Sequence, residues 1–189
     1  MTSQETGSAA DYPPALLEKA GNVSLLVLDV DGVLTNGGLY FSNDGEALKR
    51  FSILDGLGIK LLAANGVATG IITGRKSGIV ERRAAELSIP YLVQGREDKR
   101  SALMELLEQC AVPASQCAYV GDDLPDIGAM RHSQLGIAVA NAHAEVKKRA
   151  DWVCARNGGE GAVREIADML LHARGSYAQA IENFVRQQE

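Results

Sequence analysis

The sequence predicts an α/β protein with a doubly wound parallel sheet, on three observations. Short aliphatic runs recur along the chain, and Leu25–Leu28 is the clearest of them. Longer segments with helical spacing of apolar residues separate these runs, and unbroken aliphatic runs are typical of strands buried on both faces. Strands that alternate with helices imply right-handed crossovers and a parallel sheet. The 189 residues, 46% of them hydrophobic, are enough for one domain with a sizeable core.

The composition argues against several other classes of protein. A net charge of −5 disfavours a nucleic-acid or anionic membrane surface as the partner. The three cysteines, Cys110, Cys117 and Cys154, show no Cys-x-x-Cys spacing, so neither a disulfide framework nor a zinc site is indicated. No apolar run approaches the roughly 18 residues of a membrane span, and the start lacks the features of a signal peptide. We therefore expect a cytoplasmic protein.

The amino-terminal part predicts a short helix, a strand and a hairpin. Residues 1–12 are expected to be disordered, because small and polar residues dominate residues 1–10, and a helix over 15–20 follows two prolines. The strand at Leu25–Leu28 comes next. Residues 37–51 then predict a β-hairpin, because Asn43-Asp44-Gly45 separates two strand-like arms. This hairpin is too small to be a domain and should project from the carboxyl end of the first strand.

The remainder alternates regularly up to residue 174, so residues 13–174 are expected to form a single core domain. Helix ends are indicated by Asn65-Gly66 and Pro113, and Pro125 fits the first turn of a helix. We expect helices over residues 54–64, 76–87, 98–110, 125–131, 145–149 and 162–171, and strands over 67–72, 91–94, 117–120, 136–139 and 152–154.

The last segment, residues 175–189, is polar with sparse apolar positions. Their spacing is compatible with a loosely amphipathic helix, which by itself would be marginal in water. The tail either frays or docks on a partner subunit. Its apolar residues are Tyr177, Ala180, Ile181, Phe184 and Val185.

Polar residues follow several of the predicted strands where the strands end. Asp29 and Asp31 follow the first strand, and Thr73-Gly74-Arg75 follows the second. Lys99 opens the helix after the strand at 91–94, and an acidic cluster, residues 121–126, follows a later strand. The carboxyl ends of parallel strands open onto the crevice where ligands bind. Each residue alone could be a cap, a turn or a surface charge, but together they predict a phosphate-handling site.

The order of acid pair, threonine, lysine and acid cluster resembles the haloacid dehalogenase superfamily of phosphatases. Its four motifs are matched by Asp29-Val30-Asp31-Gly32-Val33, Thr73, Lys99 and Gly121-Asp122-Asp123-Leu124-Pro125-Asp126, and the resemblance runs from about residue 25 to residue 171. It implies that Asp29 is the nucleophile, which forms an aspartyl-phosphate, and that Asp31 is the acid and base. Thr73 and Lys99 would bind the phosphoryl oxygens.

The resemblance also implies a magnesium site. A phosphate monoester repels nucleophiles, and Mg²⁺ is a hard ion that takes carboxylate, phosphate and water oxygens. Asp29, Asp122 and the carbonyl of Asp31 would hold the metal. Asp123 and Asp126 would orient Lys99, Asp122 or metal-bound water.

Most members of this superfamily carry a cap domain, and this sequence has no room for one. The first insertion point holds only the hairpin, and the second, between Thr73 and Lys99, holds one helix and one strand. Because an open site does not exclude water, something else should close it. Self-association through the hairpin, with its apolar Leu39, Tyr40 and Phe41, is the expected means.

The details resemble the capless phosphatases of 3-deoxy-D-manno-octulosonate 8-phosphate. The resemblance implies a sugar acid phosphate substrate, a role in lipopolysaccharide precursor synthesis, and a homotetramer in which neighbours complete each site. Arg75, with Gly74 beside it, is expected to meet the sugar carboxylate. Asp55 and Gly56 would touch the sugar, although Asp55 could equally be the N-cap of its helix. The matching stretches are residues 28–33, 40–51, 55–59, 71–75, 119–123 and 161–165.

One position departs from that family, and two alternatives stay open. Glu160, in the loop Gly158–Gly161, stands where many relatives have a basic residue, and a glutamate near an anionic sugar is unfavourable. Either it points away or the substrate is a related nine-carbon sugar acid phosphate. A phospho-accepting signalling domain is the alternative of a different class. It is disfavoured, because Asp31 supplies a second acid suited to hydrolysis and such domains order these residues differently.

Overall fold

A six-stranded parallel sheet forms the centre of the molecule in the computed structural model, which describes residues 8–186. The strand order is β5-β4-β1-β6-β7-β8, so the chain winds outward in both directions from β1. The predicted fold class, with a hairpin insertion and no cap domain, is confirmed. The strands are β1 (Leu25–Leu28), β4 (Ala68–Thr73), β5 (Tyr91–Gln94), β6 (Cys117–Gly121), β7 (Leu135–Ala138) and β8 (Trp152–Val153).

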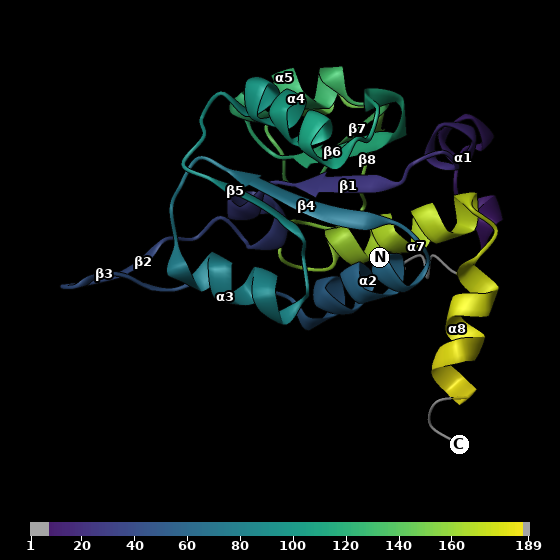
Figure 1. Cartoon of the computed structure of the whole chain (residues 1–189), viewed down its shortest axis with the longest axis horizontal. Coiled ribbons are helices and arrows are strands. Elements are labelled where there is room, and N and C mark those ends of the chain that lie inside the picture. The colour runs from purple at the N-terminus through teal and green to yellow at the C-terminus, as the bar shows by residue number, and fades with distance from the viewer. Residues whose placement is uncertain (1–7, 187–189) are drawn as a thin grey trace.

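Helices cover both faces of the sheet, as Figure 1 shows. On one face α4 packs against α5, and on the other α2 packs against α7. The four residues of β1 are fully buried, because β4 and β6 flank it and helices lie on either side. The helices are α1 (Pro14–Ala20), α2 (Ile53–Ala64), α3 (Gly78–Glu86), α4 (Lys99–Cys110), α5 (Ile127–His132), α6 (Ala144–Lys147), α7 (Ala162–Ala173) and α8 (Tyr177–Arg186).

The register of the sheet brings three strand ends together. Leu28, the last residue of β1, is aligned with Ile71 of β4 and with Val120 of β6. The residues that follow these strands therefore lie at one edge. This edge holds the acid pair after β1, Thr73 at the end of β4, and the acidic cluster after β6.

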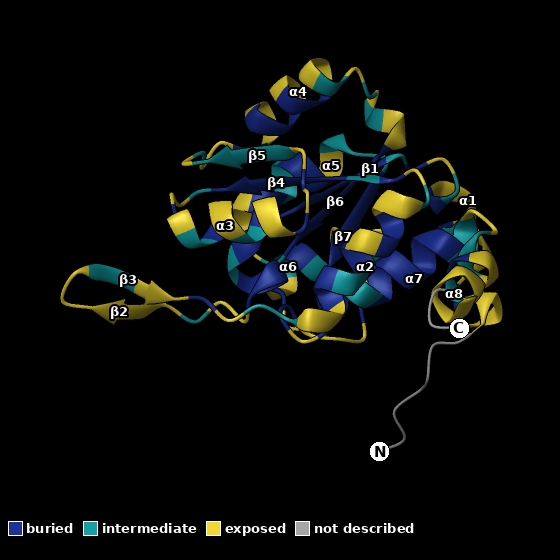
Figure 2. Cartoon of the chain, turned by 60° about the horizontal axis from the view of Figure 1, so that its bottom comes forward, coloured by how far each residue is buried: buried dark blue, intermediate teal, exposed yellow. Residues whose placement is uncertain are grey.

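The hairpin of β2 (Tyr40–Ser42) and β3 (Gly45–Leu48) projects away from the sheet (Figure 2). Its base is closed by an antiparallel bridge between Thr35 and Phe51. The side chains of Leu39, Tyr40 and Phe41 are exposed, and Phe41 is 62% exposed. This apolar surface on two short strands matches the surface predicted for self-association.

The amino-terminal segment differs in part from the prediction of disorder over residues 1–12. Residues 1–7 lie outside the described residues. Residues 9–11 form a short helical turn that Ser8 caps, and Tyr12 is buried with its ring edge-on to Trp152, 6.0 Å between centroids. Tyr12 therefore anchors this segment to the core. The sequence did not predict this contact, because a single tyrosine after a polar stretch gives no pattern of burial.

The carboxyl-terminal tail forms the predicted helix, α8. Tyr177 stacks on His172 of α7, with the ring centroids 4.0 Å apart, and Ala180 is buried. Beyond these contacts α8 leads away from the sheet (Figure 1), and Phe184 and Val185 are exposed. Docking of this tail on a partner subunit stays a prediction. Within residues 8–186, no helix combines the length and the apolar character needed to cross a membrane.

Candidate active site

The turn after β1 presents the two acids on a tightly held backbone. The N–H and Oγ1 of Thr35 both donate to the carbonyl of Val30, at 3.0 and 3.2 Å. Gly32 has a φ of +107°, which favours glycine, and a Cβ there would lie 2.1 Å from a carboxylate oxygen of Asp122. Glycine in the Asp-x-Asp-Gly motif therefore lets the carboxylate of Asp122 lie against this turn.

Asp29 and Lys99 form the buried centre of the site. The Nζ of Lys99 lies 2.8 Å from Oδ1 of Asp29 and 2.7 Å from Oδ1 of Asp126. All three side chains are almost fully buried. A buried lysine is tolerable because two carboxylates oppose its charge. The predicted nucleophile and the predicted phosphate-binding lysine are thus brought into contact.

Asp126 organises the loop after β6. One of its oxygens accepts hydrogen bonds from the backbone N–H groups of Asp122 and Asp123, at 3.1 and 3.2 Å. The other accepts from the hydroxyl of Tyr119 at 3.0 Å and from Lys99. Both oxygens of Asp126 are thus occupied by contacts with Tyr119, Lys99 and the Asp122 loop, and its indirect role in the reaction stays a prediction.

The cluster brings three carboxylates, those of Asp29, Asp122 and Asp126, close to a single lysine, Lys99. Burial, helped by repulsion from Asp126, raises the pKa of Asp29 from its ordinary 3.8 to about 6, although Lys99 opposes the shift. Burial and the charges of Asp29 and Asp126 raise the pKa of Asp122 to about 8. A divalent cation would relieve this repulsion and return both groups to the carboxylate form.

The donor set fits a hard cation. Asp29, Asp122 and Asp126 each place one carboxylate oxygen within 4.8 Å of the others. Because both oxygens of Asp126 already accept hydrogen bonds, Asp29 and Asp122 are the carboxylates available as ligands. Two carboxylates with room for phosphate and water oxygens suit Mg²⁺. The carbonyl of Asp31 as a third ligand stays a prediction.

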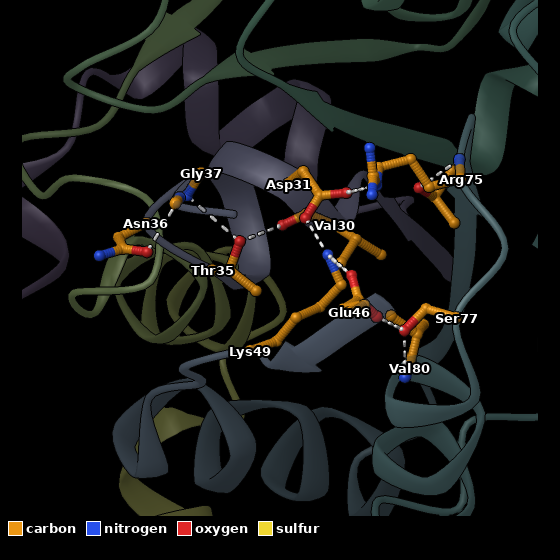
Figure 3. A network of polar contacts seen from close by, with 12 residues as sticks. Val30, Asp31, Thr35, Asn36, Gly37, Glu46, Lys49, Arg75, Ser77 and Val80 are labelled. Atoms are coloured by element: carbon orange, nitrogen blue, oxygen red, sulfur yellow. Dashed lines mark hydrogen bonds and ion pairs between the residues drawn. The ribbon is translucent and has the colours of Figure 1, made fainter. Parts of the chain in front are cut away.

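Asp31 lies on the hairpin side of the site, two residues from Asp29 (Figure 3). One carboxylate oxygen accepts a hydrogen bond from Nζ of Lys49, and the other lies 3.9 Å from Nε of Arg75. The Arg75 guanidinium also lies over the ring of Phe41, with 5.9 Å from Cζ to the centroid. Arg75 is half-exposed at the mouth of the site, where a substrate could reach it.

Thr73 and Gly74 lie at the end of β4, at the same edge. Thr73 is buried, and its Oγ1 accepts a hydrogen bond from the N–H of Arg75 at 3.4 Å. Gly74 is half-buried, and a Cβ there would meet only the side chain of Glu97 at 3.6 Å. A side chain at Gly74 would therefore be tolerated by the protein itself, and a close approach of the substrate to this glycine stays a prediction.

The loop Gly158–Gly161 packs on the turn after β1. A Cβ on Gly158 would lie 1.6 Å from the carbonyl oxygen of Gly32, so only glycine fits. Glu160 lies 3.7 Å from Arg50, and both side chains are about half exposed. The acid that departs from the family pattern therefore has a cation opposite it.

Three predicted residues, Asp55, Gly56 and Asp123, do not join the Asp29 and Lys99 cluster, and their assigned roles stay predictions. Asp55 is buried and accepts a hydrogen bond from the N–H of Arg164 at 2.9 Å, in the first turn of α7, while Ser52 caps α2 instead. A Cβ on Gly56 would lie 2.5 Å from the Arg83 guanidinium, so this glycine serves packing. Asp123 is exposed, and its carboxylate caps the following turn through the N–H of Leu124, at 2.8 Å.

The sequence reasoning missed two residues that contact the predicted acids, Tyr119 and Lys49. Tyr119 was predicted only to be part of a strand. The neighbouring sequence does not indicate that its hydroxyl donates a hydrogen bond to Asp126. Lys49 is flanked by the exposed Leu48 and Arg50. Lys49 and Arg50 follow β3, and the sequence does not say which of these two basic side chains is buried.

The fold, the acid pair and the Lys99 cluster define a haloacid dehalogenase-like hydrolase, and a sequence profile of that description matches residues 89–166. The 3-deoxy-D-manno-octulosonate 8-phosphate phosphatase KdsC of Escherichia coli (strain K12) is 47% identical over 183 residues, which are 95% of this chain and 97% of that protein. The chain belongs to the family of 3-deoxy-D-manno-octulosonate 8-phosphate phosphatases and is a phosphoric monoester hydrolase.

Solved structures of that family superpose closely on this one. The Moraxella catarrhalis phosphatase, in complex with a magnesium ion, a phosphate ion and a KDO molecule, has a TM-score of 0.89 and 38% identity, and covers 92% of this chain and 99% of its own. The cobalt-bound Haemophilus influenzae enzyme has a TM-score of 0.84 and 40% identity, and covers 86% and 98%. Members of the family thus bind divalent metal ions, which agrees with the Asp29 and Asp122 pair.

Proposed function

We propose that the protein hydrolyses 3-deoxy-D-manno-octulosonate 8-phosphate to the free sugar acid and phosphate, with Mg²⁺, in lipopolysaccharide precursor synthesis. One observation carries the proposal: the two acids of a single turn have different partners. Asp29 lies against Lys99, at 2.8 Å, in the buried cluster, whereas Asp31 lies against Lys49 and Arg75 beside the hairpin. Two carboxylates in different environments suit a nucleophile and a separate acid and base.

In the first step Asp29 acts as the nucleophile. A carboxylate oxygen of Asp29 forms a bond to phosphorus while the bond from phosphorus to the sugar oxygen breaks, and Asp31 delivers its proton to the departing oxygen. Lys99 and Thr73 hold the phosphoryl oxygens, and Lys99 is already in place beside Asp29. Mg²⁺, held by Asp29 and Asp122, would neutralise charge on the phosphoryl group.

In the second step water regenerates the enzyme. Asp31, now a carboxylate, accepts a proton from the water as its oxygen bonds to phosphorus, and the bond from phosphorus to Asp29 breaks. Phosphate leaves, and Asp31 is again protonated for the next turnover. The half-buried position of Asp31, 19% exposed, gives water access to it that the Asp29 carboxylate lacks.

The substrate class is supported by the charge at the mouth of the site. Arg75 presents a half-exposed guanidinium on the same side as Asp31, so a sugar whose phosphate lies on Lys99 would bring its carboxylate toward Arg75. The nine-carbon alternative was kept because of Glu160. That acid is opposed by Arg50 at 3.7 Å, so the reason for a different sugar is weakened.

The assembly and location belong to the same proposal. We propose a cytoplasmic homotetramer that forms through the hairpin, whose Leu39, Tyr40 and Phe41 are exposed beside the site. Exposed apolar side chains on short edge strands favour pairing with another copy. Closure of the site by a neighbour would replace the cap domain that this chain lacks.

A substrate panel tests the assignment. Purified protein with Mg²⁺ is assayed for phosphate release from 3-deoxy-D-manno-octulosonate 8-phosphate, from a nine-carbon sugar acid 9-phosphate and from glucose 6-phosphate. We expect kcat/KM for the octulosonate to exceed that for glucose 6-phosphate by at least about 100-fold, because the hexose lacks the carboxylate. Comparable values on the octulosonate and the hexose would contradict the proposal, and a preference for the nine-carbon substrate would transfer it to the alternative.

A further inference from the structure

Lys49 is a buried lysine that the phosphate site does not use. Its side chain is 1% exposed, although the hairpin strands before it consist of exposed and half-buried residues (Figure 2). Lys49 directly follows β3, and the side chains before and after it, Leu48 and Arg50, are exposed. Burying an ammonium group is costly unless it is paired, which raises the question of what Lys49 holds.

The partners of Lys49 answer that question. Its Nζ donates to Oδ1 of Asp31 and lies 3.0 Å from Oε1 of Glu46 (Figure 3). The other oxygen of Glu46 accepts a hydrogen bond from the hydroxyl of Ser77. Ser77 is the N-cap of α3, where its Oγ accepts from the N–H of Val80 at 3.4 Å. A continuous chain of contacts therefore runs from a core helix through the hairpin to Asp31.

The contacts on either side of Lys49 show that it is held by the protein and in turn holds Asp31. Glu46 ties the ammonium of Lys49 within the hairpin, and Ser77 ties Glu46 to α3. The hairpin is also closed at its base, by the bridge between Thr35 and Phe51. Lys49 is thus anchored on the protein side, and its remaining hydrogen-bonding capacity is directed at Asp31.

We propose that Lys49 is a positioning residue for the acid and base step: it holds the Asp31 carboxylate on the hairpin side, apart from Asp29, where the leaving oxygen departs. The inference rests on the proposed role of Asp31. A general acid must lie within hydrogen-bond reach of the leaving oxygen, and a displacement of about 1 Å is enough to cost roughly 100-fold in rate.

The test compares two leaving groups in one variant. In Lys49→Met, kcat/KM should fall by about 100-fold on the sugar acid 8-phosphate but by less than about threefold on p-nitrophenyl phosphate, whose leaving group needs little protonation. Asp31→Asn should show the same selective loss. The double variant should lose no more on the sugar phosphate than Asp31→Asn alone, because Lys49 acts through Asp31.

Two further variants guard the result. Lys60→Met removes an exposed lysine from α2 and should change neither value. Lys49→Arg keeps the charge but displaces it, so we expect a selective loss of about tenfold on the sugar phosphate. If Lys49→Met does not fold, as judged by circular dichroism, Lys49→Arg decides.

Each outcome has one meaning. Equal losses on both substrates, or no loss on either, would show that Lys49 only supports the hairpin and would overturn the inference. Additive losses in the double variant would overturn it as well. If Asp31→Asn lowered kcat/KM equally on both substrates, the proposed role of Asp31 as the acid would be contradicted. This result does not depend on the Lys49 variants, so it is distinguishable from a failure of the inference about Lys49.

Discussion

The edge of the sheet and the hairpin each hold one of the two acids, and they do so by different means. Asp29 is held at the sheet edge by Lys99, which Asp126 also contacts, and all three side chains are almost fully buried. Asp31 is held from the hairpin, which consists of two short strands with exposed and half-buried residues. A lone two-stranded hairpin is marginally stable, whereas a central strand shares the stability of the whole core.

The difference separates the duties of the two residues. Phosphoryl transfer needs a nucleophile and cations at fixed positions, and the sheet edge supplies them. In the proposed mechanism, protonation of the leaving group depends on how the sugar lies, and Lys49 holds Asp31 on the same side as Arg75, the residue proposed to meet the sugar carboxylate. The predictions that follow test the separation, from the largest expected effect to the smallest.

Replacing Asp29 by Asn should remove turnover on every phosphate ester. The amide is a poor nucleophile, so we expect kcat to fall by at least about 10,000-fold, while thermal unfolding shows that the fold persists. Lys99 keeps Asp126 as a partner at 2.7 Å, which limits the structural damage. Phosphate release at a tenth of the wild-type rate would place the nucleophile elsewhere.

Replacing Asp126 by Ala should cost the sheet edge its stability. Lys99, the Tyr119 hydroxyl and two backbone N–H groups would lose an acceptor in a buried place. We expect the free energy of unfolding to fall by about 3–5 kcal/mol in urea titrations. Asp123→Asn is the matched control, because Asn also caps a helical turn, and it should change stability by less than about 0.5 kcal/mol. Equal effects would mean that Asp126 does not organise this edge.

The sequence predicts the sheet edge better than it predicts the contacts of individual side chains around it. Residues that end buried parallel strands share an edge whatever the loops do, so Asp29, Thr73 and Asp122 could be grouped from strand order alone. The contacts of Tyr119 and Lys49 depend on which way a side chain faces in the folded protein, and short patterns leave that open. The contact of Asp55 with the N–H of Arg164, at the amino terminus of α7, was not predicted, because the two residues are 109 positions apart in the sequence.

The charge of the sheet edge predicts how metal and pH act together. The pKa values of Asp29 and Asp122, about 6 and about 8, lie above the ordinary 3.8, so without metal the folded state binds more protons than the unfolded state in this range. Stability of the metal-free protein should therefore fall as pH rises from 5 to about 8. Mg²⁺ should raise the melting temperature more at pH 8 than at pH 6, because it binds the deprotonated form.

Differential scanning fluorimetry in EDTA and in Mg²⁺ checks this dependence. The control is Asp122→Asn. It removes the carboxylate with the higher pKa of the two proposed ligands, so the shift in melting temperature caused by Mg²⁺ should differ less between pH 6 and pH 8. A metal-induced shift that is the same at pH 6 and pH 8 in the wild type would show that these carboxylates are already ionised before metal binds.

Unlike the sheet edge, the hairpin should tolerate an added charge with little change in the stability of the single chain, whereas the assembly of several copies should be weakened. Phe41 is 62% exposed, so Phe41→Asp should change the unfolding free energy of the chain by less than about 0.5 kcal/mol. The same charge in an apolar contact between copies would be costly, so light scattering should show a smaller assembly. Met104→Asp places a charge on a comparably exposed side chain of α4, 47% exposed, and should leave the assembly intact. If Phe41→Asp keeps the full assembly, the hairpin is not the contact, and closure of the site must come from another part of the chain.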